Sequence, residues 1–107
     1  MKRYEILWTR LAPVEGSEMS KTRPCVIVSD DLRNEILPTV VVCALTSTIR
    51  PQWRTRLTVI CAGRKADICA EQIRTVSKSR LGKKLGSLSA RDAAALRRLL
   101  GGMYADS

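Results

Sequence analysis

Two runs of apolar residues dominate the hydrophobic pattern of the chain. Residues 24–28 (PCVIV) and 39–45 (TVVVCAL) are almost continuously apolar and rich in β-branched side chains. Such short runs are typical of central strands that are buried on both faces, because β-branched side chains fit a strand better than a helix. Between them, Ser29 and Asp30 can cap one or two helical turns, which must end before Pro38. We therefore expect two core strands joined by a short helix.

Four further segments have the composition of strands with a more polar face. Residues 4–11 (YEILWTRL) predict a first strand. Residues 54–61 (RTRLTVIC) begin with alternating basic and apolar positions, as in a strand with one wet, positively charged face. Residues 66–73 (ADICAEQI) predict another strand after a turn at residues 63–65, and residues 83–88 predict a short strand at the edge of the sheet.

The end of the sequence has the clearest helical pattern. Over residues 89–104, Ser89 and Asp92 match a capping box, and a run of alanines gives high helix propensity. Gly101 and Gly102 predict the end of this helix. Its expected buried stripe consists of Leu96, Leu99, Leu100 and Met103.

The order of these elements predicts a mainly β protein of the α+β class with a C-terminal helix. A chain of 107 residues has the size of one domain, so we expect a single domain over residues 1–107. Many short strands in so small a domain favour a strongly bent antiparallel sheet covered by helices, an SH3-like barrel.

The charge of the chain points to a polyanionic partner. Nineteen Lys and Arg against ten Asp and Glu give a net charge of +9, which favours nucleic acid; a merely solvated basic surface is the alternative. No stretch is long and apolar enough for a signal peptide or a membrane span, so we expect a cytosolic protein that does not bind membranes. The four cysteines are irregularly spaced and are expected to be reduced core thiols.

Several kinds of chemistry lack their residues in this sequence. There is no histidine, no HExxH or DxD metal motif, and neither glycine-rich nucleotide-binding motif. Arg, Lys, carboxylate and hydroxyl side chains remain, and these suit phosphate chemistry, since a guanidinium holds phosphate oxygens in two places and stabilises growing negative charge. Histidine acid–base catalysis, zinc chemistry and P-loop nucleotide binding are therefore set aside, and we expect no cofactor.

Three segments carry a resemblance to a known family. The runs EGSEMSKTRPCVIVS, PTVVVCALTS and AEQIRTVSKSRLGKKLGSLS follow one another over residues 15–29, 38–47 and 70–89. In order and spacing they resemble the MazF/PemK family of toxin endoribonucleases from type II toxin–antitoxin systems. Three weak motifs in register are far more specific than one.

The resemblance implies a fold, a reaction and partners. The fold is the SH3-like barrel shared by CcdB and PemK, a homodimer with an RNA groove along the subunit boundary. The reaction is sequence-specific, metal-independent cleavage of single-stranded RNA, typically mRNA. The 2′-hydroxyl attacks the adjacent phosphate and leaves a 2′,3′-cyclic phosphate and a 5′-hydroxyl. An acidic MazE-like antitoxin is the expected protein partner.

The family's catalytic motifs fall on two residues of this chain. The Arg of its Arg-Pro pair matches Arg23, which should stabilise the phosphorane and can protonate the leaving 5′-oxygen. The Thr of its Thr-Ser pair matches Thr46, which can bind a phosphate oxygen and align the attack. The structural alternatives are an ion pair of Arg23 with Glu18 or Asp30, and a hydrogen bond of Thr46 to the backbone.

The chain departs from some relatives around this site. Where they have a histidine this chain has Ser17, and where they place an Arg and an Asp it has Cys69 and Glu71. Glu71 is a candidate general base if a desolvated groove raises its pKa, and a surface charge if it faces solvent. The residues with an expected supporting role in catalysis are Glu18, Ser47 and Glu71.

The expected RNA-binding residues are mostly basic. Trp53 lies in a stretch with three arginines, a composition suited to phosphate contacts and to stacking an unpaired base. The alternative is an exposed loop whose Trp53 folds onto the core. The full set consists of Ser17, Lys21, Arg50, Trp53, Arg54, Arg56, Gln72 and Arg74, with Arg80 as a further extension.

Two other functions compete with the nuclease. One is a non-catalytic toxin on the same barrel, like the CcdB type that inhibits DNA gyrase by occupying it. The other is a general single-strand RNA-binding module. The presence of both Arg23-Pro24 and Thr46-Ser47 favours the nuclease, because an inhibitor has no need of these motifs.

Overall fold

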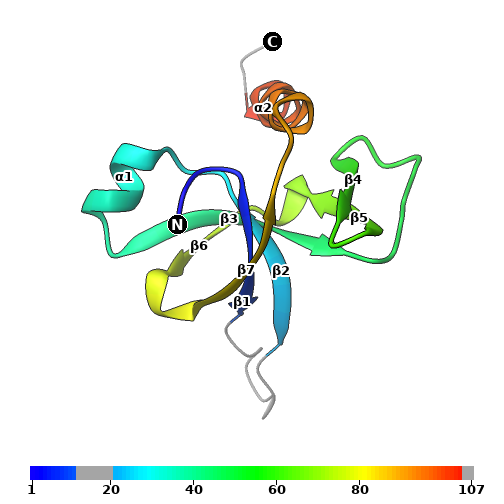
Figure 1. The fold of residues 1–107 in the computed structure, drawn as a ribbon. Coiled ribbons are helices and arrows are strands. Elements are labelled where there is room, and N and C mark those ends of the chain that lie inside the picture. Colours follow the sequence, from blue (N-terminus) through cyan, green and yellow to red (C-terminus); the bar gives the residue numbers. More distant parts are fainter. Residues whose placement is uncertain (12–20, 105–107) are drawn as a thin grey trace, which may run out of the picture.

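Antiparallel strands are the main secondary structure of the protein, for which a computed structural model describes residues 1–11 and 21–104 (Figure 1). The strands in these residues join in one sheet of order β4-β5-β3-β2-β1-β7, and β6 pairs with β3 beside this path. Their bounds are β1 Glu5–Arg10, β2 Thr22–Ile27, β3 Thr39–Thr46, β4 Arg56–Cys61, β5 Arg64–Cys69, β6 Arg74–Ser77 and β7 Leu81–Ser87.

The sheet bends along β3, which has two different neighbours on one edge. The first half of β3, from Thr39 to Val42, pairs with β6, whereas Leu45 and Thr46 pair with β5. The hairpin of β4 and β5 therefore turns away from the other strands, and the sheet curls into a half-barrel (Figure 1). The expected strongly bent antiparallel sheet is confirmed, and β7 is at its edge, as the sequence predicts.

The core has two parts, one on each face of the central strands. Val26 of β2 and Cys43 of β3 belong to one cluster, together with Leu96 of the C-terminal helix α2 (Ala90–Tyr104), which covers that face (Figure 1). Ile27 and Val42 belong to the other cluster. Neighbouring side chains of a strand point to opposite faces, so the two continuous apolar runs are buried on both sides, as predicted.

A short helix, α1 (Asp31–Ile36), connects β2 and β3. The side chain of Asp30 accepts a hydrogen bond of 2.9 Å from the backbone N–H of Arg33, so Asp30 is its N-cap. The helix ends before Pro38, as expected. Ser29 is not a cap, because its hydroxyl accepts a hydrogen bond of 3.0 Å from the backbone N–H of Val41 instead.

The structure corrects the predicted strands of the second half. The expected strand over residues 66–73 is broken, because β5 ends at Cys69 and a 3-10 turn, η1 (Ala70–Gln72), leads into β6. Strand β6 and the second 3-10 turn, η2 (Lys78–Arg80), have no counterpart in the sequence prediction. The expected strand over residues 54–61 begins only at Arg56.

The C-terminal helix also differs from its prediction at one end. Ser89 caps it through a hydrogen bond of 3.1 Å from the backbone N–H of Asp92, but Gly101 and Gly102 do not end it, and α2 continues to Tyr104. Neither glycine has the positive φ angle of a helix-ending glycine.

Within the described residues, no helix combines the length and the apolar character that crossing a membrane requires.

The cysteines are free thiols, as expected. Cys25, Cys43 and Cys69 are buried, and Cys61 is partly exposed. Burial raises the pKa of Cys43 to about 12 and also raises the pKa of Cys69. These thiols therefore stay protonated and are poor nucleophiles at neutral pH.

Candidate active site

A groove with a volume of about 450 Å³ opens where β2 and β3 meet the β4–β5 hairpin. Two of the residues singled out from the sequence, Arg23 and Thr46, line this groove together. Its lining consists of Trp8, Arg23, Pro24, Leu45, Thr46, Ser47, Cys61, Ala62, Arg64, Lys65, Ala66 and Leu85.

Arg23 and Thr46 are brought together by the pairing of β2 with β3. Cys25 is paired with Ala44 across these antiparallel strands, and Arg23 and Thr46 each lie two residues beyond that pair, where both line the groove. The two motifs, which are 23 positions apart in the sequence, thus meet at one wall of the groove.

Among the described residues, the contacts of both side chains leave groups that can bind a ligand. Thr46 Oγ1 accepts a hydrogen bond of 3.2 Å from the backbone N–H of Thr48, so its own O–H can donate elsewhere. The backbone contact expected as the alternative for Thr46 therefore exists but does not use its proton. Within residues 1–11 and 21–104 Arg23 forms no ion pair, and Asp30 binds Arg33 instead. Glu18 and Ser17 lie outside the described residues.

The groove combines positive charge with apolar walls. Arg23, Arg64 and Lys65 bring cationic groups, and none of the described lining residues is acidic. Trp8 and Pro24 are among the apolar lining residues. Such a groove suits an anionic ligand that also has flat apolar parts, which describes a nucleotide chain.

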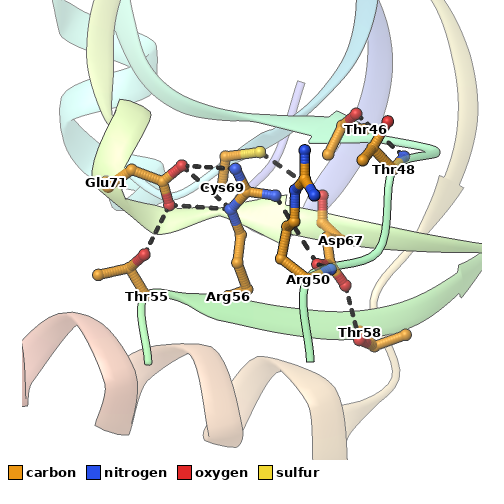
Figure 2. A network of polar contacts seen from close by, with 9 residues as sticks. All are labelled: Thr46, Thr48, Arg50, Thr55, Arg56, Thr58, Asp67, Cys69 and Glu71. Atoms are coloured by element: carbon orange, nitrogen blue, oxygen red, sulfur yellow. Dashed lines mark hydrogen bonds and ion pairs between the residues drawn. The ribbon is translucent and has the colours of Figure 1, made fainter. Parts of the chain in front are cut away.

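A network of polar side chains lies between the ends of β3, β4 and β5 (Figure 2). Arg56 Nε is 3.0 Å from each carboxylate oxygen of Glu71, and its Nη2 is 2.9 Å from Glu71 Oε2. Thr55 Oγ1 donates to the same carboxylate at 2.8 Å. Partial burial alone would raise the pKa of Glu71, but these hydrogen bonds outweigh it and the pKa lies below its ordinary value. Without RNA in the groove, Glu71 thus lacks the raised pKa that a general base needs, and its role in catalysis stays a prediction.

Arg56 does not have the exposed position that the sequence suggested. Its side chain is only 8% exposed, and its guanidinium is held by Glu71 and lies 3.7 Å from Asp67. The alternation of basic and apolar residues suggested a wet face, but two carboxylates from β5 and η1 compensate the charge of Arg56 inside the fold. Arg56 is thus held inside the fold, and its predicted phosphate contact stays a prediction.

Asp67 is the residue of this region that the sequence analysis missed. It is fully buried in β5 and is the strand partner of Thr46. Its carboxylate accepts hydrogen bonds from Thr58 Oγ1 at 2.6 Å and from the backbone N–H of Arg50 at 2.8 Å. The one signal in the sequence was an acidic residue inside the apolar run ADIC, since buried carboxylates normally have partners.

The other predicted RNA-binding residues within the described part of the chain are exposed. Arg50, Trp53 and Arg54 lie on the loop between β3 and β4, and the Trp53 side chain, 48% exposed, is not folded onto the core. Three further predicted RNA-binding residues are exposed outside this loop, namely Lys21, Gln72 and Arg74. Among the residues described, no group of three or more His, Cys, Asp or Glu side chains could hold a metal ion.

Comparison with known proteins agrees with the family resemblance of the sequence motifs. The model of a family described as "PemK-like, MazF-like toxin of type II toxin-antitoxin system" matches residues 2–103. The chain belongs to the PemK/MazF toxin family. This PemK/MazF-family chain is 39% identical over 94 residues to the endoribonuclease MazF of Staphylococcus saprophyticus, covering 83% of the chain and 78% of that protein.

Solved structures of MazF proteins share the fold. The Mycobacterium tuberculosis toxin MazF-mt6 superposes with a TM-score of 0.78 at 22% identity, over 94% of this chain and 95% of that one. A chain of the MazE-MazF complex (Form-II) from Deinococcus radiodurans superposes with a TM-score of 0.84 at 22% identity, over 100% and 97%. These likenesses establish the PemK/MazF fold for the chain.

Proposed function

We propose that this PemK/MazF-family protein is a sequence-specific endoribonuclease that cuts single-stranded RNA, with mRNA as its main target and without a metal. The observation that carries the proposal is that Arg23 and Thr46 line one basic groove from neighbouring strands. The similar protein of Staphylococcus saprophyticus bears the name endoribonuclease MazF, which supports the same reaction.

In the proposed reaction the RNA supplies its own nucleophile. The 2′-oxygen attacks the adjacent phosphorus while the proton of its hydroxyl passes to solvent water, the bond from phosphorus to the 5′-oxygen breaks, and the products carry a 2′,3′-cyclic phosphate and a 5′-hydroxyl. Arg23 stabilises the negative charge of the phosphorane and protonates the leaving 5′-oxygen, while the free O–H of Thr46 binds a phosphate oxygen. Glu18 and Ser47 keep a supporting role, and Ser47 lines the groove beside Thr46. Glu71 acts through Arg56 rather than as a base.

The test uses purified protein and a single-stranded RNA in EDTA. We expect cleavage to continue in EDTA, and we expect an RNA with 2′-deoxy or 2′-O-methyl sugar before the cut to bind and stay intact. A need for Mg²⁺, or cutting of the modified RNA, contradicts the mechanism. RNA that is bound but never cut favours the binding-module alternative, and gyrase inhibition without RNA cleavage favours the CcdB-like one.

We also propose that the active unit is a cytosolic homodimer held inactive by an acidic MazE-like antitoxin. One domain of this size offers little concave surface, and two copies related by a two-fold axis form a longer groove. The net charge of +9 favours an acidic segment as a mimic of RNA. Two structurally similar chains come from complexes named for an antitoxin, one from a mycobacterial species and one from Deinococcus radiodurans.

Two measurements test these partners separately. Sedimentation at micromolar concentration should show a dimer, and a fully active monomer refutes that part. A cognate acidic peptide should displace RNA, with a competition that weakens as salt is added. Simultaneous binding of peptide and RNA refutes the mimicry.

A further inference from the structure

Trp53 is an exposed aromatic side chain whose ring is packed against arginine. The Arg56 guanidinium lies over the ring at 4.5 Å from its centroid, and the Arg50 guanidinium lies farther away, at 5.7 Å. Trp53 is nevertheless 48% exposed, so much of its surface remains open to solvent. The exposed part of the indole is flat, apolar surface that a stacked base can cover.

The Arg56 side chain cannot move freely against this ring. Its side chain is 8% exposed, and three contacts of 2.9 to 3.0 Å fix the guanidinium to Glu71. Nη1 lies 3.7 Å from Asp67 and has no hydrogen-bond partner among the residues that the structure describes. A guanidinium that is buried and held in this way is a rigid support rather than a group that reaches out to a ligand.

The loop that carries Trp53 is tied down at both ends. At its start, the backbone N–H of Arg50 donates to Asp67 at 2.8 Å (Figure 2), and the backbone N–H of Trp53 donates to the carbonyl of Arg50 at 3.0 Å. At its end, the backbone N–H of Arg56 donates to the carbonyl of Trp53 at 3.3 Å. Since Asp67 is the strand partner of Thr46, the loop is anchored next to the candidate active site.

We infer that Trp53 is a stacking platform for one unpaired RNA base beside the scissile phosphate, and that Arg56 is the positioning residue that holds it. The inference rests on the proposed RNA substrate. Stacking on an indole requires a base that has left a duplex, so the platform selects single-stranded RNA. A ring that is already ordered loses little entropy when the base binds, which strengthens binding without a new contact.

The first experiment measures binding of a short single-stranded RNA with 2′-O-methyl sugars, which cannot be cut. Trp53→Ala should weaken binding roughly ten- to hundredfold, the range of one lost base–aromatic stack, whereas Trp53→Phe should keep most of the affinity. An abasic nucleotide at one position of the RNA should weaken binding to the unmutated protein but not to Trp53→Ala. Equal losses in both proteins at every position overturn the platform.

The second experiment separates positioning by Arg56 from a phosphate contact. Arg56→Lys keeps the charge but lacks the planar fork. It should therefore weaken RNA binding when Trp53 is present, and it should change RNA binding little when it is combined with Trp53→Ala. An equal loss in both backgrounds overturns the positioning role. Arg98→Lys, on the exposed face of α2, is the matched control. If Arg56→Lys fails to fold, Glu71→Gln loosens the same support and enters the same comparison.

Cleavage of unmodified RNA is measured in parallel and keeps the two proposals apart. Coupling between Trp53 and one base in a protein that does not cut RNA contradicts the nuclease and supports the platform. Cleavage without that coupling contradicts the platform and supports the nuclease. If Trp53→Ala lowers kcat and leaves KM unchanged, the platform is also overturned, because stacking should act mainly on binding.

Discussion

The Arg56 guanidinium and the Glu71 carboxylate form a forked ion pair, with Nε 3.0 Å from both carboxylate oxygens and Nη2 2.9 Å from Oε2. The pair joins β4 to η1, two elements that are separated in sequence by β5. Because Arg56 is buried, the pair is better shielded from water than an ordinary surface ion pair. Because the Arg56 guanidinium also lies over the Trp53 ring, the pair connects β4 and η1 to the loop that carries Trp53.

The first prediction concerns the acid sensitivity of this pair. Folding lowers the Glu71 pKa below its ordinary value of 4.5, so the contribution of the pair to the free energy of unfolding is complete above that value and is lost as the pH falls through the folded-state pKa. Glu71→Gln should therefore cost about 1 kcal/mol at neutral pH and progressively less in acid.

The measurement is urea unfolding of both proteins between about pH 7 and about pH 3. The pKa values of Glu5 and Asp30 are lowered as well, so both proteins should lose stability in acid, and only the difference between them reports on Glu71. A difference that stays constant over this range contradicts the prediction.

The second prediction concerns the buried carboxylate of Asp67. Asp67→Asn replaces one acceptor oxygen by an N–H₂ group, so one of the two donors, Thr58 Oγ1 or the Arg50 backbone N–H, loses its acceptor. It also removes a negative charge that compensates the buried Arg56. We expect a loss of roughly 2–4 kcal/mol and a clear drop in Tm. Glu35→Gln, an exposed acid-to-amide change, is the control. Equal Tm values for the two variants would show that Asp67 has no such role.

The third prediction concerns Arg23 and Thr46 in the proposed reaction. Arg23→Ala should lower cleavage by roughly a hundredfold or more, as expected when one electrostatic stabiliser of the transition state is lost, while RNA binding falls much less. Thr46→Val keeps the shape but removes the O–H and should also lower kcat, and Thr46→Ser should restore much of it. Single-turnover cleavage measures these rates, with Arg98→Ala as the control. Near-normal cleavage by folded Arg23→Ala contradicts the proposed role.

The sequence predicted those features that depend on local pattern. The β2 and β3 strands were recognisable because β-branched residues fill both faces. Arg23 and Thr46 were singled out because their motifs resemble those of a known family, and no local pattern predicted that both line one groove. The orientation of Arg56 was not predictable in this way. It depends on two carboxylates, Asp67 and Glu71, that follow it by 11 and 15 positions and that only the β4–β5 hairpin brings beside it.

The fourth prediction concerns the packing of α2 on the sheet. Leu96 is completely buried in the core cluster, so Leu96→Ala should cost about 2–5 kcal/mol through lost apolar contact and a residual cavity. The matched change Leu32→Ala, at a side chain of α1 that is 67% exposed, should alter stability by no more than about 0.5 kcal/mol. Chemical denaturation of both variants provides the comparison, and similar midpoints would contradict the placement of α2.

The fifth prediction follows from the continuation of α2 through Gly101 and Gly102. Both glycines are helical, neither has a positive φ angle, and a Cβ atom at either position meets no heavy atom within 4 Å. Alanine is favoured over glycine inside a helix because glycine loses more backbone entropy on folding. Gly101→Ala and Gly102→Ala should each raise the free energy of unfolding by roughly 0.5–1 kcal/mol.

Thermal unfolding of the single and double variants measures this effect, and the helical circular dichroism signal should rise slightly with it. Gly63→Ala is the matched control, because Gly63 has a φ angle of 79° in the β4–β5 turn and alanine is strained there. The same substitution should thus stabilise the protein in α2 and destabilise it in the turn. If the glycines instead ended the helix with a left-handed residue, at least one of the α2 substitutions would lower the Tm, as in the turn.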